Sequence, residues 1–359
     1  MRRRNPTALL LLLLVCLLCC TPKAEPTPIG EATAAPSLMA SPSPVRTVIP
    51  TASPVPTPAP TPTPSATPEP TATPVPTPFS LIWLPDTQGI VSSDKAFRRA
   101  WMGQLGEEIA ARIEPENVVC VLHTGDIVDY GNRTKQWETF GDCLNAFIDR
   151  IPFYPVSGNH DVCKYDSVTG GSYKGYLEQP FLKRLNPEQT FEGGKMLYAV
   201  LGGGEHPLLL LGIGYDMGRE ADELAWIDEV MRSHADMPCI VFTHAYITWR
   251  GTVLRYCRQI EENIVARYPN ICMLLCGHAR GNYYTVASYD DDGDGTAERK
   301  VHILLFNGQD EDGYLYRALE MDMIRHSVAV RTYALGSSDP VPDDPNTHQP
   351  ADFLIENFY

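Results

Sequence analysis

VVCVLHTGDIVDYG, at residues 118–131, sets an uninterrupted apolar run directly before a polar turn. A short continuous apolar run that ends in a turn indicates a β-strand buried on both faces. In an open α/β sheet, ligands bind in the crevice outside the carboxyl ends of the strands. The segment therefore predicts a strand that delivers the turn Gly125-Asp126-Ile127-Val128-Asp129 to a site at the edge of a sheet.

The same pattern of apolar run and polar motif recurs four more times along the chain. The motifs are Asp86-Thr87-Gln88 after SLIWLP, Gly158-Asn159-His160-Asp161 after IPFYPVS, Thr243-His244 after CIVF, and Gly277-His278-Ala279-Arg280 after ICMLLC. Carboxylates, amide oxygens and imidazoles are the side chains that hold divalent cations in proteins. Five such motifs predict that distant loops converge on one metal centre.

The remaining pattern predicts one α/β domain over residues 79–359. Apolar runs predict buried strands at 79–84, 117–122, 152–156, 207–213, 238–242 and 271–276. Amphipathic stretches predict helices at 94–113, 132–149, 220–234 and 252–267. After Arg280, further apolar or alternating runs are separated by Asp and Gly turns and predict strands. We expect these late strands to complete the second sheet of a layered sandwich.

The beginning of the chain predicts a signal peptide at residues 1–20. Met1-Arg2-Arg3-Arg4 precedes an apolar run from Ala8 to Cys20, which is shorter than the roughly 20 apolar residues that cross a bilayer. Leu17-Leu18-Cys19-Cys20 is similar to a bacterial lipobox and favours an extracellular lipoprotein, anchored to the cell envelope through a lipid on Cys20. A simple secretory signal is the alternative.

Residues 21–78 hold 18 prolines and 12 threonines, many of them in Thr-Pro pairs. Proline at this density blocks the hydrogen bonding of helices and sheets. The segment is therefore predicted to be a disordered linker with polyproline-II character. Thr-Pro tracts also serve as O-glycan acceptors, and this second interpretation stays open.

Charge and cysteine content exclude several classes of protein. Residues 1–78 hold five of the 29 Lys and Arg residues and three of the 44 Asp and Glu residues, which leaves 24 basic and 41 acidic residues, a formal charge of −17, in the remainder. A domain with this excess of acidic residues repels nucleic acids and anionic membranes. We therefore expect the protein to contact the membrane through the lipid anchor alone. Seven cysteines beyond Cys20, without CxxC spacing, argue against a disulfide framework and a zinc ribbon.

The five motifs, in their order and spacing, resemble those of the calcineurin-like metallophosphoesterase superfamily. LPDTQ together with HTGDIVDYG and SGNHD is similar to a bacterial secreted subgroup that carries Gln in the first motif. The resemblance implies a four-layer αββα sandwich of two mixed β-sheets. It also implies a hydrolase of phosphomonoesters or phosphodiesters with two divalent metal ions (Mn, Fe or Zn) and a metal-activated hydroxide as nucleophile.

The resemblance further implies a role for each motif residue. The expected metal ligands are Asp86, Gln88, Asp126, Asn159, His244 and His278. Asp126 would bridge both metals, one of which would also bind Asn159 and the two histidines, while the other would bind Asp86 and Gln88. His160 would protonate the leaving oxygen or steady the developing charge, with Asp161 orienting its ring. Asp129 would support the ligands from outside.

Two positions depart from the family pattern, and both belong to the same expected metal site. Gln88 and Arg280 stand where the family usually has His. Gln88 offers an amide oxygen, whereas a protonated Arg280 cannot coordinate a metal. In one interpretation both ions bind, and the oxygen-rich site suits Mn²⁺, Mg²⁺ or Ca²⁺. In a second, only one ion is tightly bound and Arg280 binds the substrate phosphate.

A third interpretation makes the centre degenerate. The protein would then be a surface module that binds a phosphorylated or anionic ligand without turning it over. In the enzyme interpretations the partner is a phosphorylated small molecule or a glycan substrate, and no nucleic acid is involved.

Other signals in the domain have ordinary explanations. Asp290–Asp294 has the acidic spacing of a calcium loop, but Val301 stands at its twelfth position, so we favour a polar hairpin turn over a Ca²⁺ site. His123 lies in a strand and is predicted to be a core or supporting residue. Loops beside the motifs are typical of substrate selection, and one interpretation has Tyr165, Tyr173, Lys174 and Tyr246 line a pocket there. The default interpretation is that they are ordinary loop residues.

Overall fold

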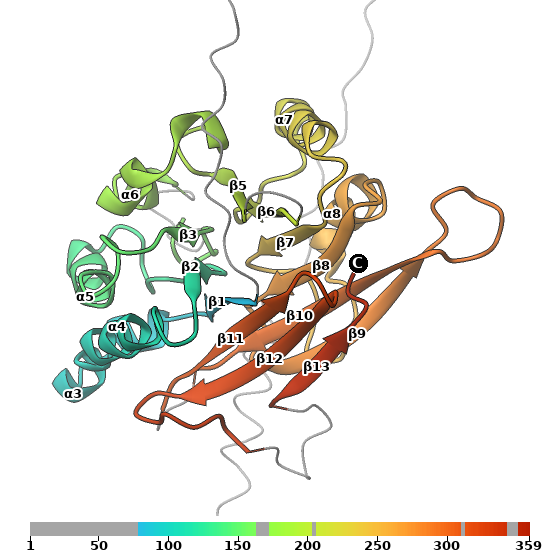
Figure 1. The fold of residues 1–359 in the computed structure, drawn as a ribbon. Coiled ribbons are helices and arrows are strands. Elements are labelled where there is room, and N and C mark those ends of the chain that lie inside the picture. Colours follow the sequence, from blue (N-terminus) through green and yellow to red (C-terminus); the bar gives the residue numbers. More distant parts are fainter. Residues whose placement is uncertain (1–77, 163–171, 203–205, 310–312, 343–350) are drawn as a thin grey trace, which may run out of the picture. The chain divides into compact units, whose positions relative to one another are not determined.

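The computed structural model describes residues 78–162, 172–202, 206–309, 313–342 and 351–359. Within these ranges the chain forms two β-sheets with helices against their outer faces (Figure 1). The predicted signal peptide with Cys20, the linker up to residue 77, and Tyr165 lie outside the described residues. Among the residues that are described, no helix has both the length and the apolar character to cross a membrane.

The first sheet carries three of the motif loops. Its strands, in spatial order, are β13 (Phe353–Glu356), β12 (Ser327–Ala334), β11 (Leu315–Asp322), β1 (Phe79–Leu84), β2 (Val118–His123) and β3 (Phe153–Pro155). β1, β2 and β3 run parallel, while β11, β12 and β13 extend the sheet from β1 in antiparallel order.

The second sheet carries the other two motif loops. Its strands, in spatial order, are β4 (Thr190–Phe191), β5 (Met196–Leu201), β6 (Leu208–Ile213), β7 (Cys239–Thr243), β8 (Ile271–Cys276), β10 (Arg299–Asn307) and β9 (Gly281–Tyr289). β6, β7, β8 and β10 are parallel, and antiparallel strands close both edges. The predicted apolar runs all lie in strands, but β4 and β5 were not predicted.

The prediction that all strands after Arg280 complete the second sheet is wrong for β11, β12 and β13. Only β9 and β10 join the second sheet, whereas β11 pairs with β1 from Phe79↔Met321 to Trp83↔Arg317. A strand whose edge stays unpaired leaves its backbone N–H and C=O groups without partners. Because every residue of β1 is buried, this pairing satisfies backbone groups that water cannot reach.

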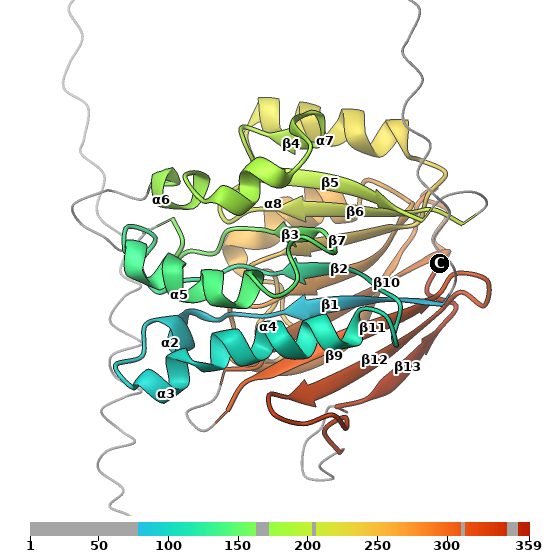
Figure 2. The ribbon, with the colours of Figure 1, turned by 60° about the vertical axis from the view of Figure 1, so that its left-hand side comes forward.

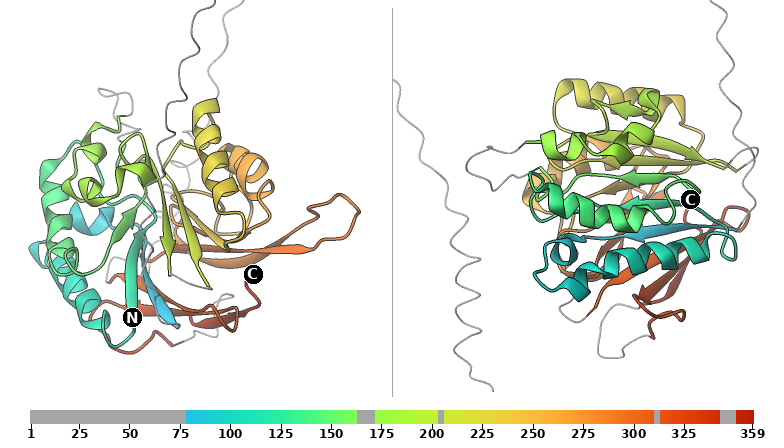
Figure 3. Two further views of the ribbon diagram at one scale, coloured as in Figure 1. Left: turned by 45° about the horizontal axis from the view of Figure 1, so that its top comes forward. Right: turned by 90° about the vertical axis from the view of Figure 1, so that its left-hand side faces the viewer.

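Side chains of β1 alternate between two apolar cores. Leu81 and Trp83 lie in the core between the sheets, while Ile82 and Leu84 pack with the helices α4 (Trp101–Arg112) and α5 (Thr134–Leu144). The outer face of the second sheet is covered by α7 (Ala221–Ser233) and the short α8 (Arg258–Ile260). Figures 2 and 3 show these helices on opposite sides of the paired sheets. The predicted four-layer αββα sandwich is therefore confirmed.

Most of the predicted helices are shorter than their sequence patterns; the stretch 132–149, for example, forms only α5. The stretch 94–113 forms α3 (Ala96–Arg99) and α4, interrupted at Ala100, and 252–267 forms η3 (Arg255–Cys257), α8 and a π-helical turn, η4 (Glu261–Val265). The stretch 220–234 matches α7. The remaining short helices are α2 (Gln88–Val91), α6 (Lys174–Leu177), η1 (Pro180–Arg184) and η2 (Pro187–Gln189).

A glycine sets the close packing of α4 on α5. A Cβ atom on Gly106 would lie 2.2 Å from the carbonyl oxygen of Cys143, a contact that no side chain tolerates. Gly103, three residues earlier on α4, has no atom within 4 Å of the same position. The two glycines therefore differ in what they contribute to the fold.

We predict opposite effects for alanine at these two positions. Gly106→Ala will force α4 away from α5 and lower the free energy of unfolding by about 1–3 kcal/mol. Gly103→Ala will raise it by about 0.5–1 kcal/mol, because alanine favours the helix. Urea unfolding of the two variants measures both effects. Equal stability would show that the Gly106 contact does not constrain the helix pair.

Candidate metal centre

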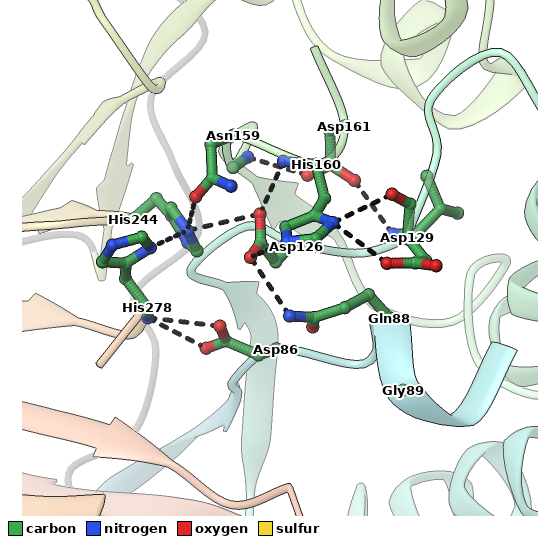
Figure 4. A network of polar contacts seen from close by, with 12 residues as sticks. Asp86, Gln88, Gly89, Asp126, Asp129, Asn159, His160, Asp161, His244 and His278 are labelled. Atoms are coloured by element: carbon green, nitrogen blue, oxygen red, sulfur yellow. Dashed lines mark hydrogen bonds and ion pairs between the residues drawn. The ribbon is translucent and has the colours of Figure 1, made fainter. Parts of the chain in front are cut away.

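The five motif loops meet at one edge of the sandwich, as the sequence predicts (Figure 4). Each motif directly follows a strand: β1 precedes Asp86, β2 precedes Asp126, β3 precedes Asn159 and His160, β7 precedes His244, and β8 precedes His278. Three of these strands belong to one sheet and two to the other. The centre therefore spans the junction of the sheets.

One side of the centre is rich in nitrogen ligands. Atoms of Asp126, His244 and His278 that can bind a metal all lie within 4.8 Å of one another. Nε2 of His244 lies 3.3 Å from Oδ1 of Asp126 and 3.0 Å from Oδ1 of Asn159. Nδ1 of His278 lies 3.0 Å from the same Nε2. A carboxylate, an amide oxygen and two imidazoles thus face one point.

The backbone fixes which nitrogen of His244 faces the centre. Its Nδ1 lies 2.9 Å from the carbonyl oxygen of Thr124, which can only accept, so Nδ1 carries a proton and Nε2 points inward. Burial disfavours the protonated ring and lowers its pKa. The negative charge and the hydrogen bond of Asp126 have the larger effect, and they raise the pKa of His244 to about 9. Burial and the neighbouring His244 lower the pKa of His278 to about 4. A bound cation would replace the proton on Nε2.

The other side of the centre offers oxygen ligands. Both carboxylate oxygens of the buried Asp86 accept from the backbone N–H of His278, at 3.2 Å each. Nε2 of Gln88 donates to Oδ2 of Asp126 at 3.1 Å, while its Oε1 is buried and has no hydrogen-bond partner among the described residues. Burial raises the pKa of Asp86 to about 7. A buried acceptor without a partner beside buried carboxylates fits a cation that prefers oxygen.

Tight turns bring the backbones of the β2 and β3 loops together. Asp126 has φ 53° and follows Gly125, with φ 89°. A Cβ atom on Gly158 would lie 2.1 Å from the backbone nitrogen of Asp126, so the β3 loop needs glycine there. The backbone N–H of His160 then donates to Oδ1 of Asp126 at 2.9 Å. The β2 and β3 loops therefore hold the carboxylate of Asp126 in place, and the same β3 loop supplies the neighbouring Asn159 and His160.

Asp161 was predicted to orient the ring of His160, and the structure gives that position to Asp129. Nδ1 of His160 lies 2.9 Å from the carbonyl oxygen and 3.0 Å from Oδ1 of Asp129. Asp161 instead accepts from the backbone N–H groups of Gly158 (2.7 Å), Val128 (2.9 Å) and Ile127 (3.2 Å). It ties the β2 and β3 loops together, a role that the motif alone does not reveal.

The other predicted residues fall into different environments. Arg280 is exposed, and no hydrogen bond or ion pair joins its guanidinium to the described part of the chain. His123 is buried, accepts at Nδ1 from the backbone N–H of Gly125 (3.1 Å), and lies 3.2 Å from the hydroxyl of Thr87, as expected of a supporting residue. The prediction for Tyr246 is wrong, because it is fully buried in the core under α7 and α8.

The loop side chains and the acidic turn can also be placed. Tyr173 donates its hydroxyl to the carbonyl of Tyr215, and Lys174 begins α6. The polar turn at Asp290–Asp294 joins β9 and β10 in an antiparallel hairpin, as predicted. Four exposed carboxylates gather there: Asp290, Asp292, Asp294 and Glu298.

Sequence reasoning missed three residues that contact the centre from outside. The hydroxyl of Tyr256 lies 3.2 Å from Nε2 of His278. Nδ2 of Asn307 donates to the carbonyl of His278 at 3.3 Å, and Oε1 of Gln309 accepts from the backbone N–H of Gly89 at 3.1 Å. The last two follow the apolar run ILLF, the same signal of strand and polar motif that marks the other loops.

Comparison with known proteins identifies the family. Residues 90–279, more than half of the 359-residue chain, match the calcineurin-like phosphoesterase family model, and the chain belongs to this family. Its members bind two divalent metals and hydrolyse phosphoesters. The chain is 28% identical over 266 residues to the uncharacterized protein YvnB of Bacillus subtilis (strain 168), covering 71% of this chain. It spans only 20% of the length of that relative.

A solved structure shares the fold. Purple acid phosphatase PPD1 from yellow lupin (Lupinus luteus) seeds superposes with a TM-score of 0.53 and 12% sequence identity. The match covers 80% of this chain and 55% of the lupin chain. At this identity the likeness concerns the fold alone.

We predict that divalent metal stabilises the protein through Asp126. After removal of metals with EDTA, Mn²⁺ at about 100 times its Kd will raise the free energy of unfolding by about 2.7 kcal/mol, because the ion binds the folded state. Asp126→Asn will abolish this gain, whereas Asp142→Asn, on the exposed face of α5, will keep it. Thermal melting with and without Mn²⁺ tests this. A gain that survives in Asp126→Asn would place the ion elsewhere.

Proposed function

We propose that this protein is a cell-surface phosphoesterase that acts on phosphorylated small molecules or glycans. The observation that carries the proposal is the convergence of Asp86, Asp126, Asn159, His244 and His278 at one edge of a fold shared with this family of hydrolases.

The two sides of the centre would hold different ions. His244, His278 and Asn159 would bind one cation, and Asp86 and Gln88 the other. Asp126, which lies beside His244 through Oδ1 and accepts from Gln88 through Oδ2, would bind both. Bound cations would polarise the phosphate and lower the pKa of a water molecule. Since the Asp86 side offers only oxygen, we infer that it selects Mn²⁺ or Mg²⁺ over Zn²⁺. The nitrogen side suits Mn, Fe or Zn.

His160 is placed to handle the proton of the leaving group. The carbonyl and the carboxylate of Asp129 both accept from Nδ1, so that nitrogen holds its proton and the ring orientation is set. Nε2 lies 3.9 Å from Oδ2 of Asp126, at the partly exposed side of the centre. From there it would donate a proton to the leaving oxygen. Arg280, on the β8 loop, would bind the substrate phosphate.

We predict turnover of p-nitrophenyl phosphate or its bis ester in the presence of Mn²⁺. Asp126→Asn and His160→Ala will each lower kcat/KM at least 100-fold, since they remove the shared ligand and the proton donor. His234→Ala, at the end of α7, is the matched control and will retain activity. Three equally inert proteins, together with an inert wild type, would instead support a module that binds anionic ligands without turnover.

The location at the cell surface rests on the amino-terminal sequence. If Cys20 is lipidated, cells expressing the full chain will incorporate a radioactive fatty acid into it, and Cys20→Ala will lose the label. Cys19→Ala is the matched control. Labelling that is unchanged in Cys20→Ala would contradict the lipoprotein assignment and leave a simple secretory signal.

A further inference from the structure

A groove lies outside the metal centre, between α5 and the segment that holds α6 and η1. Its volume is about 670 Å³, which is within the usual range of small-molecule sites. Figure 2 shows α5 and α6 next to each other on the same end of the molecule. None of the predicted metal ligands lines the groove, so it is a separate feature of this chain.

The groove begins beside the loop that positions His160. Its wall includes Gly131, whose backbone N–H donates to the carbonyl of His160 at 3.1 Å. Gly131 comes two residues after Asp129, so their Cα atoms are at most about 7.6 Å apart. A Cβ atom on Gly175 would lie 1.8 Å from the carbonyl oxygen of Gly131, so α6 and this loop are in close contact. The Gly131 end of the groove is therefore the end that adjoins the loop of His160.

The lining combines an apolar floor with neutral hydrogen-bonding groups. Leu144 and Phe181 supply buried apolar surface. The side chain of Asn145 makes no hydrogen bond to the described residues, so both its donor and its acceptor are available. Nε2 of Gln179 donates to the carbonyl of Gly175 at 2.6 Å, which leaves its Oε1 as an acceptor.

Charge in the groove disfavours an anionic occupant. Glu138 and Glu178 both line it. The guanidinium of Arg184, the cation among the described lining residues, is already paired with Asp149. Glu138 lies 3.4 Å from Nζ of Lys135 and Glu178 lies 3.8 Å from Nζ of Lys174, and each glutamate keeps its other carboxylate oxygen as an acceptor. Carboxylates and amides accept from hydroxyl groups, while the apolar floor suits the C–H face of a ring. A sugar offers both kinds of surface and carries no charge.

We propose that this groove is a carbohydrate subsite, which holds the sugar of a phosphorylated carbohydrate while its phosphate lies at the metal centre. The inference rests on the proposed function and deepens it by naming the substrate class. Glu138 and Glu178 would accept from sugar hydroxyls, and Asn145 would both donate and accept. Substrates whose leaving group is charged or very small would gain no binding energy from the groove.

Gly141 on α5 provides the means to block the groove. It lines the groove, and a Cβ atom there would meet no atom within 4 Å. Gly141→Phe would therefore add a bulky ring to the groove wall with no clash at its Cβ atom, and it replaces a poor helix former. Gly103→Phe is the matched control, since Gly103 is also helical and open but lies on α4, away from the groove.

Two measurements test the proposal. In saturation-transfer NMR, methyl glucoside will receive signal from the wild type and from Gly103→Phe, and at least tenfold less from Gly141→Phe. In Mn²⁺-loaded enzyme, the ratio of kcat/KM for glucose 1-phosphate to that for p-nitrophenyl phosphate will fall at least tenfold in Gly141→Phe alone.

The outcomes separate this proposal from the proposed function. If the wild type hydrolyses neither ester but methyl glucoside still binds in a Gly141-dependent manner, the phosphoesterase proposal fails and the subsite stands. If both esters are cleaved and Gly141→Phe changes neither the ratio nor the NMR signal, the subsite is overturned. An equal loss for both esters would also overturn it, because the groove would then not select sugars.

Discussion

The centre depends on one buried carboxylate that must satisfy several neighbours at once. Asp126 accepts from the backbone N–H of His160 and from Nε2 of Gln88, and it lies beside Nε2 of His244. Burial would raise its pKa, but the charge and hydrogen bond of His244 keep the pKa below its usual value, so the group stays ionised. Both sheets supply these partners. Positioning this anion therefore requires the whole sandwich.

The sequence indicates the positions of this centre because buried parallel strands leave a simple pattern. Each apolar run of β1, β2, β3, β7 and β8 ends in polar residues, and strand direction places those ends together. The sheet membership of β11 was not predictable, since alternation reveals a strand and not its neighbour. Tyr256 escaped notice because a phenol outside a motif looks like an ordinary loop residue, whereas Gln309 follows the apolar run ILLF and carried a signal that was overlooked. The role of Asp161 depends on backbone N–H groups, which no side-chain pattern records.

The centre is chemically asymmetric, and the two departures from the family pattern explain why. Gln88 supplies an amide where an imidazole is usual, and Arg280 extends into solvent without a bond to the described residues. The imidazoles that remain, on His244 and His278, are both on the other side of Asp126. A hard cation that prefers oxygen suits the Asp86 side, and a borderline cation suits the histidine side. On the proposed assignment of ligands, the two sides would hold their ions with unequal affinities.

The three backbone bonds to Asp161 have a consequence for how ions come and go. They hold the β2 and β3 loops in place with protein groups alone. The part of the metal centre that these loops form is therefore preorganised before a cation binds. Removal of the ions by a chelator would then leave the two loops in place, and rebinding of ions would need no folding step. Ion exchange at such a centre would be reversible.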